Sequence, residues 1–348
     1  MPAHHSTEEA PRARRPTIRD VAAAAGVSKS LVSLVYAGSS HVSPERKALV
    51  LGAAAELGFR PNGVARSLAG DRDDFVGILV ADLHNPVFAD VIDAARTELA
   101  RHGRAGLLTS AILPGGAVPA QLDDHAVALF GDLRPSRLLI VGTIPDLDAV
   151  TAALPRSRIV IASASAGALD SAAVVRGDDT AGIELVVEHL IDRGHRDIAH
   201  VGGTGGAFAS LRAAGYAASL RRRGLESYVR IEIADPVQAA GYTAAKTLLA
   251  AASPPTAIVA VNDLAAVGVL AAAAEYLRDT GRRVAVVGYD DTFLAALPQI
   301  SLTTVNPGNT RIGTEAAQLL LGDDAFARAT EILVAPTLVV RESTLSRP

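Results

Sequence analysis

Carboxylates, amides and hydroxyls that come directly after apolar, strand-like runs are the side chains of this sequence best suited to bind a small polar molecule. In open α/β sheets, ligands lie beyond the carboxyl ends of the strands, where such groups gather. The residues of this kind are Asp82, His84, Asn85, Thr143, Ser163, Ser165, Asp178, Asp179, Thr204, Asn262, Asp263, Asp290 and Asp291. They can hydrogen-bond the hydroxyls of a ligand, and Arg212, after the glycine-rich residues 202–206, would add a guanidinium fork.

Helix capping is the alternative role for many of these residues. Asp178 and Asp179 before Thr180, and Asn262 and Asp263 before Leu264, fit the start of a helix as easily as a binding site. Asp290 and Asp291 could be paired carboxylates, but adjacent strand-end acids point apart as often as together. The residue types therefore fit both a ligand-binding role and a helix-capping role.

No catalytic motif accompanies these residues. The chain of 348 residues has no cysteine, which excludes disulfides, thiolate metal ligands and a cysteine nucleophile. Residues 202–206 lack the following Lys and Ser or Thr of a P-loop, and no Gly-x-Ser-x-Gly is present. We therefore expect a protein that is not an enzyme, with no metal site and no cofactor.

Charge is distributed unevenly along the chain. Residues 12–66 carry nine Lys or Arg and three acids, although the whole chain has a net charge of -4. A basic segment on an acidic body favours contact with a polyanion, the alternative being a solvated charged face. Residues 1–15 are predicted to be a disordered tail without a secretory signal. No apolar run is long enough to cross a membrane, so we expect no membrane partner. The absence of cysteine fits a reducing cytosol, and we expect a cytoplasmic protein.

Residues 16–60 have the spacing of a helix-turn-helix domain. Thr17 and Asp20 predict a capping box, Gly26 the end of the first helix, and Ser28 the start of the second. The second helix of such a domain is the recognition helix and lies in the major groove. Its outward positions here are Lys29, Ser30, Ser33 and Leu34. A three-helix structural bundle is the alternative.

A third helix is predicted after Ser43 and Pro44, and a short hinge helix within residues 61–74. The third helix would carry Ala48, Leu49, Leu51, Ala55 and Leu57 at helical spacing, with Gly58 ending it. The hinge helix would be capped by Asn62 and is too short to be stable alone in water. Its Leu68 could unstack a minor-groove base step, or it could pack on the next domain.

Together these motifs resemble the LacI/GalR (lactose-repressor) family of bacterial transcription regulators. The motifs are Thr-Ile-Arg-Asp-Val-Ala at 17–22, Ala-Gly-Val-Ser at 25–28, and Pro61-Asn62 through Ala65-Arg66-Ser67-Leu68. The resemblance implies that Lys29, Ser30 and Leu34 read bases and that Leu68 kinks a central step. It also implies a DNA-binding set that further includes Thr17, Ser28, Ser33, Asn62, Ala65 and Arg66. Many members have Arg where Leu34 stands; leucine cannot contact guanine bidentately but could touch a thymine methyl.

From Phe75 onward, strand-like runs alternate with helical ones, which predicts parallel sheets in an α/β body of two lobes. Strands are predicted at 75–80, 105–110, 138–141, 159–162, 173–176, 198–201, 257–261 and 284–287. Helices are predicted at 88–102, 180–193, 207–223 and 264–279.

The family resemblance extends over this body, through Gly-Ile-Leu-Val-Ala-Asp at 77–82, Gly-His-Arg-Asp-Ile-Ala at 194–199 and Gly-Tyr-Asp-Asp at 288–291. It implies a doubly wound fold like that of periplasmic sugar-binding proteins, covering 75–348 and crossing between lobes three times. Lobe one is expected at about 75–162 and 306–328, and lobe two at about 163–305 and 329–341. The implied effector-binding residues are Asp82, Asn85, Phe88, Arg212, Asn262 and Asp290.

Taken together, we expect a regulator that binds a pseudo-palindromic double-stranded DNA operator as a homodimer, under control of a small effector such as a sugar. Because no leucine heptad follows the last strand, a dimer is favoured over a tetramer. The alternative is a small-molecule binding protein of a transport system, which the basic N-terminal segment and the absence of a signal sequence disfavour.

Overall fold

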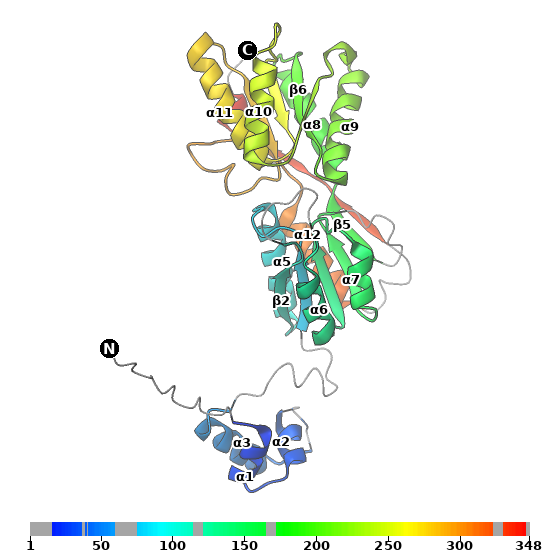
Figure 1. Ribbon diagram of the computed structural model, residues 1–348, viewed down its shortest axis with the longest axis vertical. Coiled ribbons are helices and arrows are strands. Elements are labelled where there is room, and N and C mark those ends of the chain that lie inside the picture. Colours follow the sequence, from blue (N-terminus) through cyan, green and yellow to red (C-terminus); the bar gives the residue numbers. More distant parts are fainter. Residues whose placement is uncertain are drawn as a thin grey trace, which may run out of the picture. The chain divides into compact units, whose positions relative to one another are not determined.

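The computed structural model describes residues 16–36, 39, 41–59, 75–113, 121–164, 172–322 and 330–345. It divides into two units, Met1–Asp71 and Arg72–Pro348, which we describe separately as the head and the body (Figure 1). The predicted tail, the predicted hinge with Asn62, Ala65, Arg66 and Leu68, and Ser165 lie outside the described residues.

Three helices form the described head: α1 (Ile18–Ala24), α2 (Lys29–Tyr36) and α3 (Pro44–Glu56). The predicted capping box is present, because Thr17 N donates to Asp20 Oδ2 at 2.7 Å and Asp20 N donates to Thr17 Oγ1 at 3.4 Å. Gly26 has φ +63° and ends the first helix, and Ser28 Oγ accepts from Leu31 N at 3.2 Å. The sequence therefore encodes the turn between α1 and α2 through local hydrogen bonds.

The face of α3 that packs in the head differs from the prediction. Its buried residues are Val50, Ala53 and Ala54, which lie against Val21 and Val32. The predicted residues Ala48, Leu49, Leu51, Ala55 and Leu57 are exposed. Apolar residues occur all around this helix, so periodicity alone did not select a face, and the small Ala53 and Ala54 allow the closer approach.

The first lobe of the body is built on a parallel sheet with strand order β11-β5-β4-β3-β1-β2. Its strands are β1 (Phe75–Val80), β2 (Ala105–Ser110), β3 (Arg137–Val141), β4 (Arg158–Ala162), β5 (Ala173–Gly177) and β11 (Glu331–Val334). Helices α5 (Val87–Arg101) and α12 (Asn309–Leu321) cover one face. Helices α6 (Asp124–Leu133) and α7 (Leu147–Ala153) cover the other.

The second lobe has the strand order β12-β10-β9-β8-β6-β7, parallel except for the pair of β10 with β12. Its strands are β6 (Ile198–Gly203), β7 (Ile231–Ala234), β8 (Ala257–Ala260), β9 (Ala285–Tyr289), β10 (Thr303–Asn306) and β12 (Thr337–Val339). Helices α8 (Asp179–Asp192) and α9 (Ala207–Arg222) cover one face, and α10 (Gln238–Leu249) and α11 (Asp263–Thr280) the other. Short 3₁₀ helices span Glu226–Tyr228 and Glu342–Thr344.

The chain crosses between the lobes three times, after β5, between β10 and α12, and between β11 and β12 (Figure 1). The crossings pack closely: a Cβ on Gly177 would lie 2.7 Å from Pro307 Cβ, and Gly308, with φ +88°, abuts Val334. Helix α12, after Gly308, lies in the first lobe, to which residues 306–328 were predicted to return, and its Gly313 packs against the backbone of Val91.

The predicted lobe boundaries were wrong at two strands. Residues 173–177 pair with β4 in the first sheet, with Val160 opposite Ala173, although they were assigned to the second lobe. Residues 331–334 pair with β5 in the same sheet, so within the predicted second-lobe range 329–341 only the later part, with β12, joins the second sheet. Short apolar strands do not carry a signal for which sheet they join, because that choice depends on distant partners.

Candidate functional site

A cleft of about 1190 Å³ lies between the two lobes of the body, at the carboxyl ends of strands from both sheets. This is the position where open α/β sheets bind ligands, and the volume is ample for a small polar molecule. The predicted strand-end residues that line it are Asp82, His84, Asn85, Thr143, Ser163, Asp179, Thr204 and Asp290. Asp178, Asn262, Asp263 and Asp291 do not line it.

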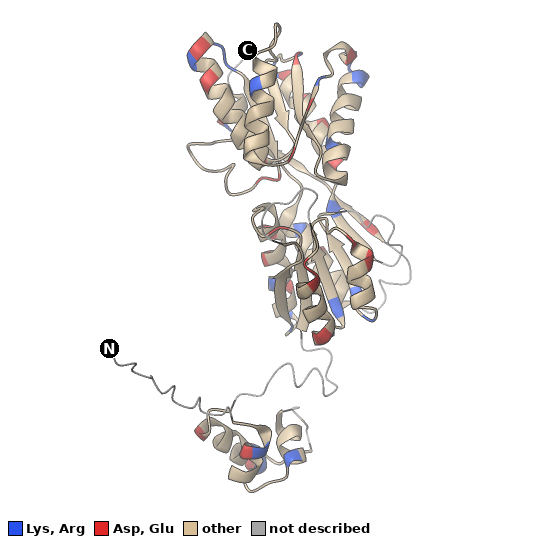
Figure 2. Cartoon of the chain, in the orientation of Figure 1, with Lys and Arg blue, Asp and Glu red and all other residues tan. Residues whose placement is uncertain are grey.

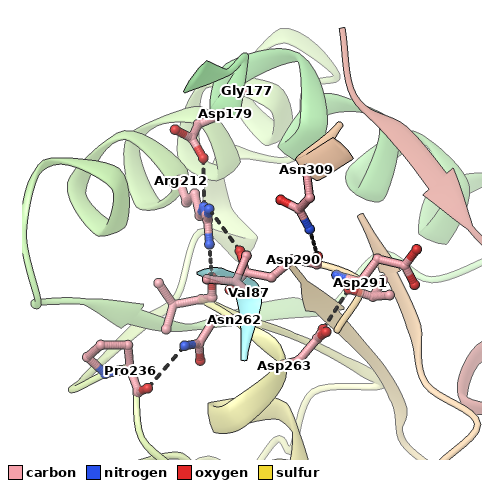
Figure 3. Close-up of polar contacts among 12 residues, drawn as sticks. Val87, Gly177, Asp179, Arg212, Pro236, Asn262, Asp263, Asp290, Asp291 and Asn309 are labelled. Carbon is pink, nitrogen blue, oxygen red and sulfur yellow. Dashed lines mark hydrogen bonds and ion pairs between the residues drawn. The ribbon is translucent and has the colours of Figure 1, made fainter. Parts of the chain in front are cut away.

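Arg212 lies at the centre of the polar contacts of the cleft (Figure 3). Its Nε donates to Asp179 Oδ1 at 2.8 Å and its Nη1 donates to the carbonyl oxygen of Val261 at 2.6 Å. Its Nη2 forms an ion pair with Asp290 Oδ1 at 3.2 Å, and the ring of Tyr289 lies 3.6 Å from the guanidinium carbon. Helix α9 therefore presents a guanidinium group whose three nitrogen atoms are all engaged.

The charge of Arg212 is secured by its two carboxylate partners. The side chain is only 6% exposed, and burial by itself would lower its pKa. Asp179 and Asp290 more than offset this, so that the pKa of Arg212 lies above its ordinary value. The arginine is therefore a permanent cation that orients the acids around it.

Asp290 is the acid of the cleft that titrates nearest to neutrality. Burial raises its pKa to about 7, against the opposing effect of Arg212, and Asp263 and Asp179 raise it further. Its backbone has φ +109°, an unfavourable conformation for a residue with a side chain. The conformation is held by hydrogen bonds from Asp290 N to Val305 O at 2.8 Å and from Asn309 Nδ2 to Asp290 O, also at 2.8 Å.

The neighbouring acid, Asp291, faces away from the cleft. Its Oδ1 accepts from Arg341 Nη2 at 2.8 Å and its Oδ2 accepts from Asn306 Nδ2 at 3.0 Å. These bonds join the ends of β9, β10 and β12 beside the crossings between the lobes. The two acids therefore do not act as a catalytic pair.

Asn262 caps helix α11, the alternative role that the sequence left open for it. Its Oδ1 accepts from Ala265 N at 2.9 Å, and its Nδ2 donates to the carbonyl oxygen of Pro236 at 3.0 Å. These bonds engage the side chain of Asn262 within the second lobe, and its contact with a ligand stays a prediction. Because Pro236 does line the cleft, Asn262 positions the wall rather than forming it. Asp178 caps α8 in the same way, accepting from Ala181 N at 3.0 Å.

The first lobe contributes Asp82, Asn85 and Phe88 to the cleft, as the sequence predicted. Asp82 Oδ1 accepts from His84 N at 2.8 Å, and Asn85 Oδ1 accepts from Val87 N at 3.3 Å, so both also shape the turn before α5. Contact of these side chains with a ligand stays a prediction.

Sequence reasoning missed six polar residues that line the cleft: Thr109, Ser110, Asp123, Arg176, Asp235 and Asn309. Arg176 lies within β5 rather than after it, and Asp235 follows β7, which was not predicted as a strand. Asn309 begins α12 after β10, another strand that was not predicted. If residues 303–306 had been predicted as a strand, Asn309 would have been among the polar residues that follow strands.

The residues of the cleft do not form a metal site. No group of three His, Asp or Glu suited to a metal ion occurs among the residues whose positions are described. In the same part of the chain, no helix is both long and apolar enough to cross a membrane.

In the head, the predicted base-reading residues Lys29, Ser30, Ser33 and Leu34 are exposed on α2, with Leu34 44% exposed. Figure 2 shows charges of both signs on the described head. Arg19, Lys29, Arg46 and Lys47 are its basic residues, because the other five basic residues of 12–66 lie outside the described part.

Comparison with known proteins decides the family. The model for bacterial regulatory proteins of the lacI family matches residues 17–62, and that for a periplasmic binding protein-like domain matches 187–344. The HTH-type transcriptional regulator CelR of Thermobifida fusca is 31% identical, over 95% of this chain and 99% of its own length. The chain belongs to the lacI family. The HTH-type transcriptional repressor PurR of Edwardsiella ictaluri is 30% identical over 95% of this chain and 98% of its own.

Solved structures of lacI-family proteins share the fold over nearly the whole chain. The lac repressor dimer bound to operator and the anti-inducer ONPF has a TM-score of 0.79 at 28% identity, covering 96% of this chain and 100% of that one. A CelR–cellobiose complex has a TM-score of 0.65 at 28% identity, covering 94% and 100%. This lacI-family chain is thus a DNA-binding transcriptional repressor controlled by a small-molecule effector, and not an enzyme. The family and fold class predicted from the sequence are confirmed.

Proposed function

We propose that two copies of this chain bind a pseudo-palindromic operator, each through a head of residues 16–60 and a hinge of residues 61–74. The exposed row of Lys29, Ser30, Ser33 and Leu34 on α2 supports major-groove contact. Thr17 and Ser28, at the starts of α1 and α2, are suited to phosphates. Asn62, Ala65 and Arg66 contact the backbone from the hinge, and Leu68 enters the minor groove. The solved lac repressor relative is a dimer on its operator.

Leu34 gives the proposed operator a specific feature. A leucine offers no hydrogen bond to a base edge, so it discriminates by apolar contact with a thymine methyl group. Lys29 beside it can reach a guanine edge or a phosphate. The half-site is therefore expected to hold a thymine opposite Leu34, and its replacement by cytosine should weaken binding.

The effector binds in the cleft between the lobes of residues 75–348, which cytoplasmic metabolites would reach. The observation that supports this proposal is the position of Arg212 in the cleft. Its guanidinium group contacts the carboxylates of Asp179 and Asp290, among strand ends from both lobes. Asp82, Asn85 and Phe88 act from the first lobe, and Asn262 acts by fixing Pro236. A small polyhydroxylated molecule suits these groups, and a CelR relative has been solved with cellobiose.

Effector and operator binding are coupled through the three crossings. The hydrogen bond from Asn309 to Asp290 joins α12 of the first lobe to the end of β9 in the second. A ligand that bridges the two lobes changes the angle between them. That change alters the spacing between the hinge segments (residues 61–74) of the two copies, and with it the stability of the hinge helices. By linkage, effector and operator must then change each other's affinity by the same factor, typically about 5–150-fold.

Fluorescence anisotropy with a labelled palindrome from the upstream region of this gene tests the proposal. Sugars, sugar phosphates and nucleosides are then titrated into the complex, with cellobiose as the first compound. Release by one compound identifies an inducer, and tightening identifies a co-repressor. The proposal is rejected if no fragment binds specifically at physiological salt with or without the compounds, and a transport binding protein becomes the better account.

A further inference from the structure

The balance of charge in the cleft is strongly negative. Among the described residues that line it, the acids are Asp82, Asp123, Asp179, Asp235 and Asp290, and the permanently charged bases are Arg176 and Arg212. Five carboxylates thus face two guanidinium groups, and the balance stays negative if Asp290 is neutral. This excess of negative charge would repel an anionic ligand that enters the cleft.

Both guanidinium groups are already paired with carboxylates of the protein, which reduces their attraction for an anionic ligand. All three nitrogen atoms of Arg212 already bind Asp179, Asp290 and the carbonyl of Val261. Arg176 Nε donates to Glu331 Oε1 at 2.7 Å, and its Nη1 donates to the carbonyl of Gly177 and lies 3.8 Å from Asp179 Oδ2. Asp179 therefore lies between the two arginines and engages both. A phosphate or carboxylate would therefore compete with these carboxylates for the two arginines.

Asn309 provides a separate indication of the ligand's chemistry. Its side chain lines the cleft and is 3% exposed, and its Nδ2 donates to Asp290 O at 2.8 Å. That bond fixes the orientation of the amide, because a flipped amide would set two oxygen atoms against each other. Asn309 Oδ1 is left without a hydrogen-bond partner among the described residues. A buried acceptor of this kind calls for a donor.

We infer that the cleft selects an effector that carries no phosphate or carboxylate group and that offers hydroxyl or amine donors, an inference that rests on the proposed function of the cleft. Neutral polyols and amine-bearing sugars or nucleosides fit this description. Sugar phosphates, nucleotides and sugar acids do not. Asp179 is the residue that sets this preference, because it occupies both arginines at once.

The test uses inorganic phosphate as an anionic probe, titrated calorimetrically into the full chain at constant ionic strength. The native chain is expected to show no saturable cleft binding up to about 10 mM. Asp179→Asn keeps an oxygen for Arg212 Nε but removes the charge, so this variant should bind phosphate at least about tenfold more tightly than the native chain. Asp178→Asn is the matched control: it removes one charge at the adjacent position, still caps α8, and should show no gain.

Two results would overturn the inference. One is saturable phosphate binding to the native chain that Arg212→Ala abolishes. The other is the absence of a gain in Asp179→Asn, or an equal gain in Asp178→Asn. If Asp179→Asn fails to fold by circular dichroism, Asp235→Asn, which also removes a cleft carboxylate, replaces it with the same expected direction. Operator anisotropy on the same preparation reports on the proposed function separately, because its failure would leave the phosphate result unchanged.

Discussion

The head and the cleft use polar residues in opposite ways. On α2 the candidate DNA contacts Lys29, Ser30 and Leu34 are exposed, and each is expected to contact DNA independently of the others. In the cleft, Arg212 and Asp290 are buried, and each is held by other charged groups. Changing one of these exposed α2 residues should therefore alter DNA recognition and little else, whereas changing a buried charged residue of the cleft should alter effector recognition and stability together.

Arg212→Ala should show this contrast most strongly. It leaves Asp179 and Asp290 buried without their cation, and removing one partner of a buried ion pair costs about 3–5 kcal/mol of unfolding free energy. Urea unfolding measures the loss, and the effector response should disappear while operator affinity of the folded protein is kept. Arg311→Ala is the control, because its ion pair with Glu315 lies on the surface and should contribute little. A stability equal to the native value would show that the cleft residues are not coupled.

Lys29→Ala should show the opposite pattern in the head. Losing one good base contact costs about 1–3 kcal/mol of binding, or roughly 5–150-fold in operator affinity. Urea unfolding should be unchanged, because the side chain is exposed. Lys47→Ala, an exposed lysine on α3, is the control, and an equal loss there would mean that Lys29 contributes only nonspecific charge.

Asp290 predicts a pH dependence of stability that arises in the cleft. Its pKa is about 7 in the folded chain and near its ordinary 3.8 when unfolded, so the folded state binds the extra proton between these values. Stability from this group is therefore greatest at the acidic end of that window and is lost as pH rises toward 7. Asp290→Asn should flatten the curve of unfolding free energy against pH, and an unchanged slope would assign the effect to Asp263, whose pKa is raised to about 6.

The smallest expected effects are changes in stability of opposite sign at two glycines of the head. Gly26 has φ +63°, so Gly26→Ala should destabilise the head by about 1–2 kcal/mol. Gly52 lies within α3, and no heavy atom lies within 4 Å of the position that a Cβ would take there, so Gly52→Ala should stabilise the head by about 0.5–1 kcal/mol. Thermal unfolding of the head measures both, and shifts of the same sign would contradict the assigned turn.

The same contrast explains what could be predicted from the sequence. The turn between α1 and α2 depends on neighbours within a few residues, so Thr17, Gly26 and Ser28 revealed it. The strand-end search found Asp179, Arg212 and Asp290 as separate candidates. It could not find that Asp179 joins two arginines, because Arg212 lies 33 residues further along the chain and Arg176 lies within a strand rather than after one.

Long-range pairing also accounts for the errors. Residues 173–177 and 331–334 join the first sheet because of their partners there, which no local pattern reveals. Asn309 was missed because residues 303–306 are a short strand between two loops.

The most direct test of the whole account is a reciprocal titration. The compound that shifts operator binding in the anisotropy experiment is titrated calorimetrically into the free protein and into its operator complex. The account predicts that the operator changes effector affinity by the same factor as the effector changes operator affinity, and that Arg212→Ala abolishes both changes. Equal effector affinity with and without operator would contradict the proposed coupling between cleft and head.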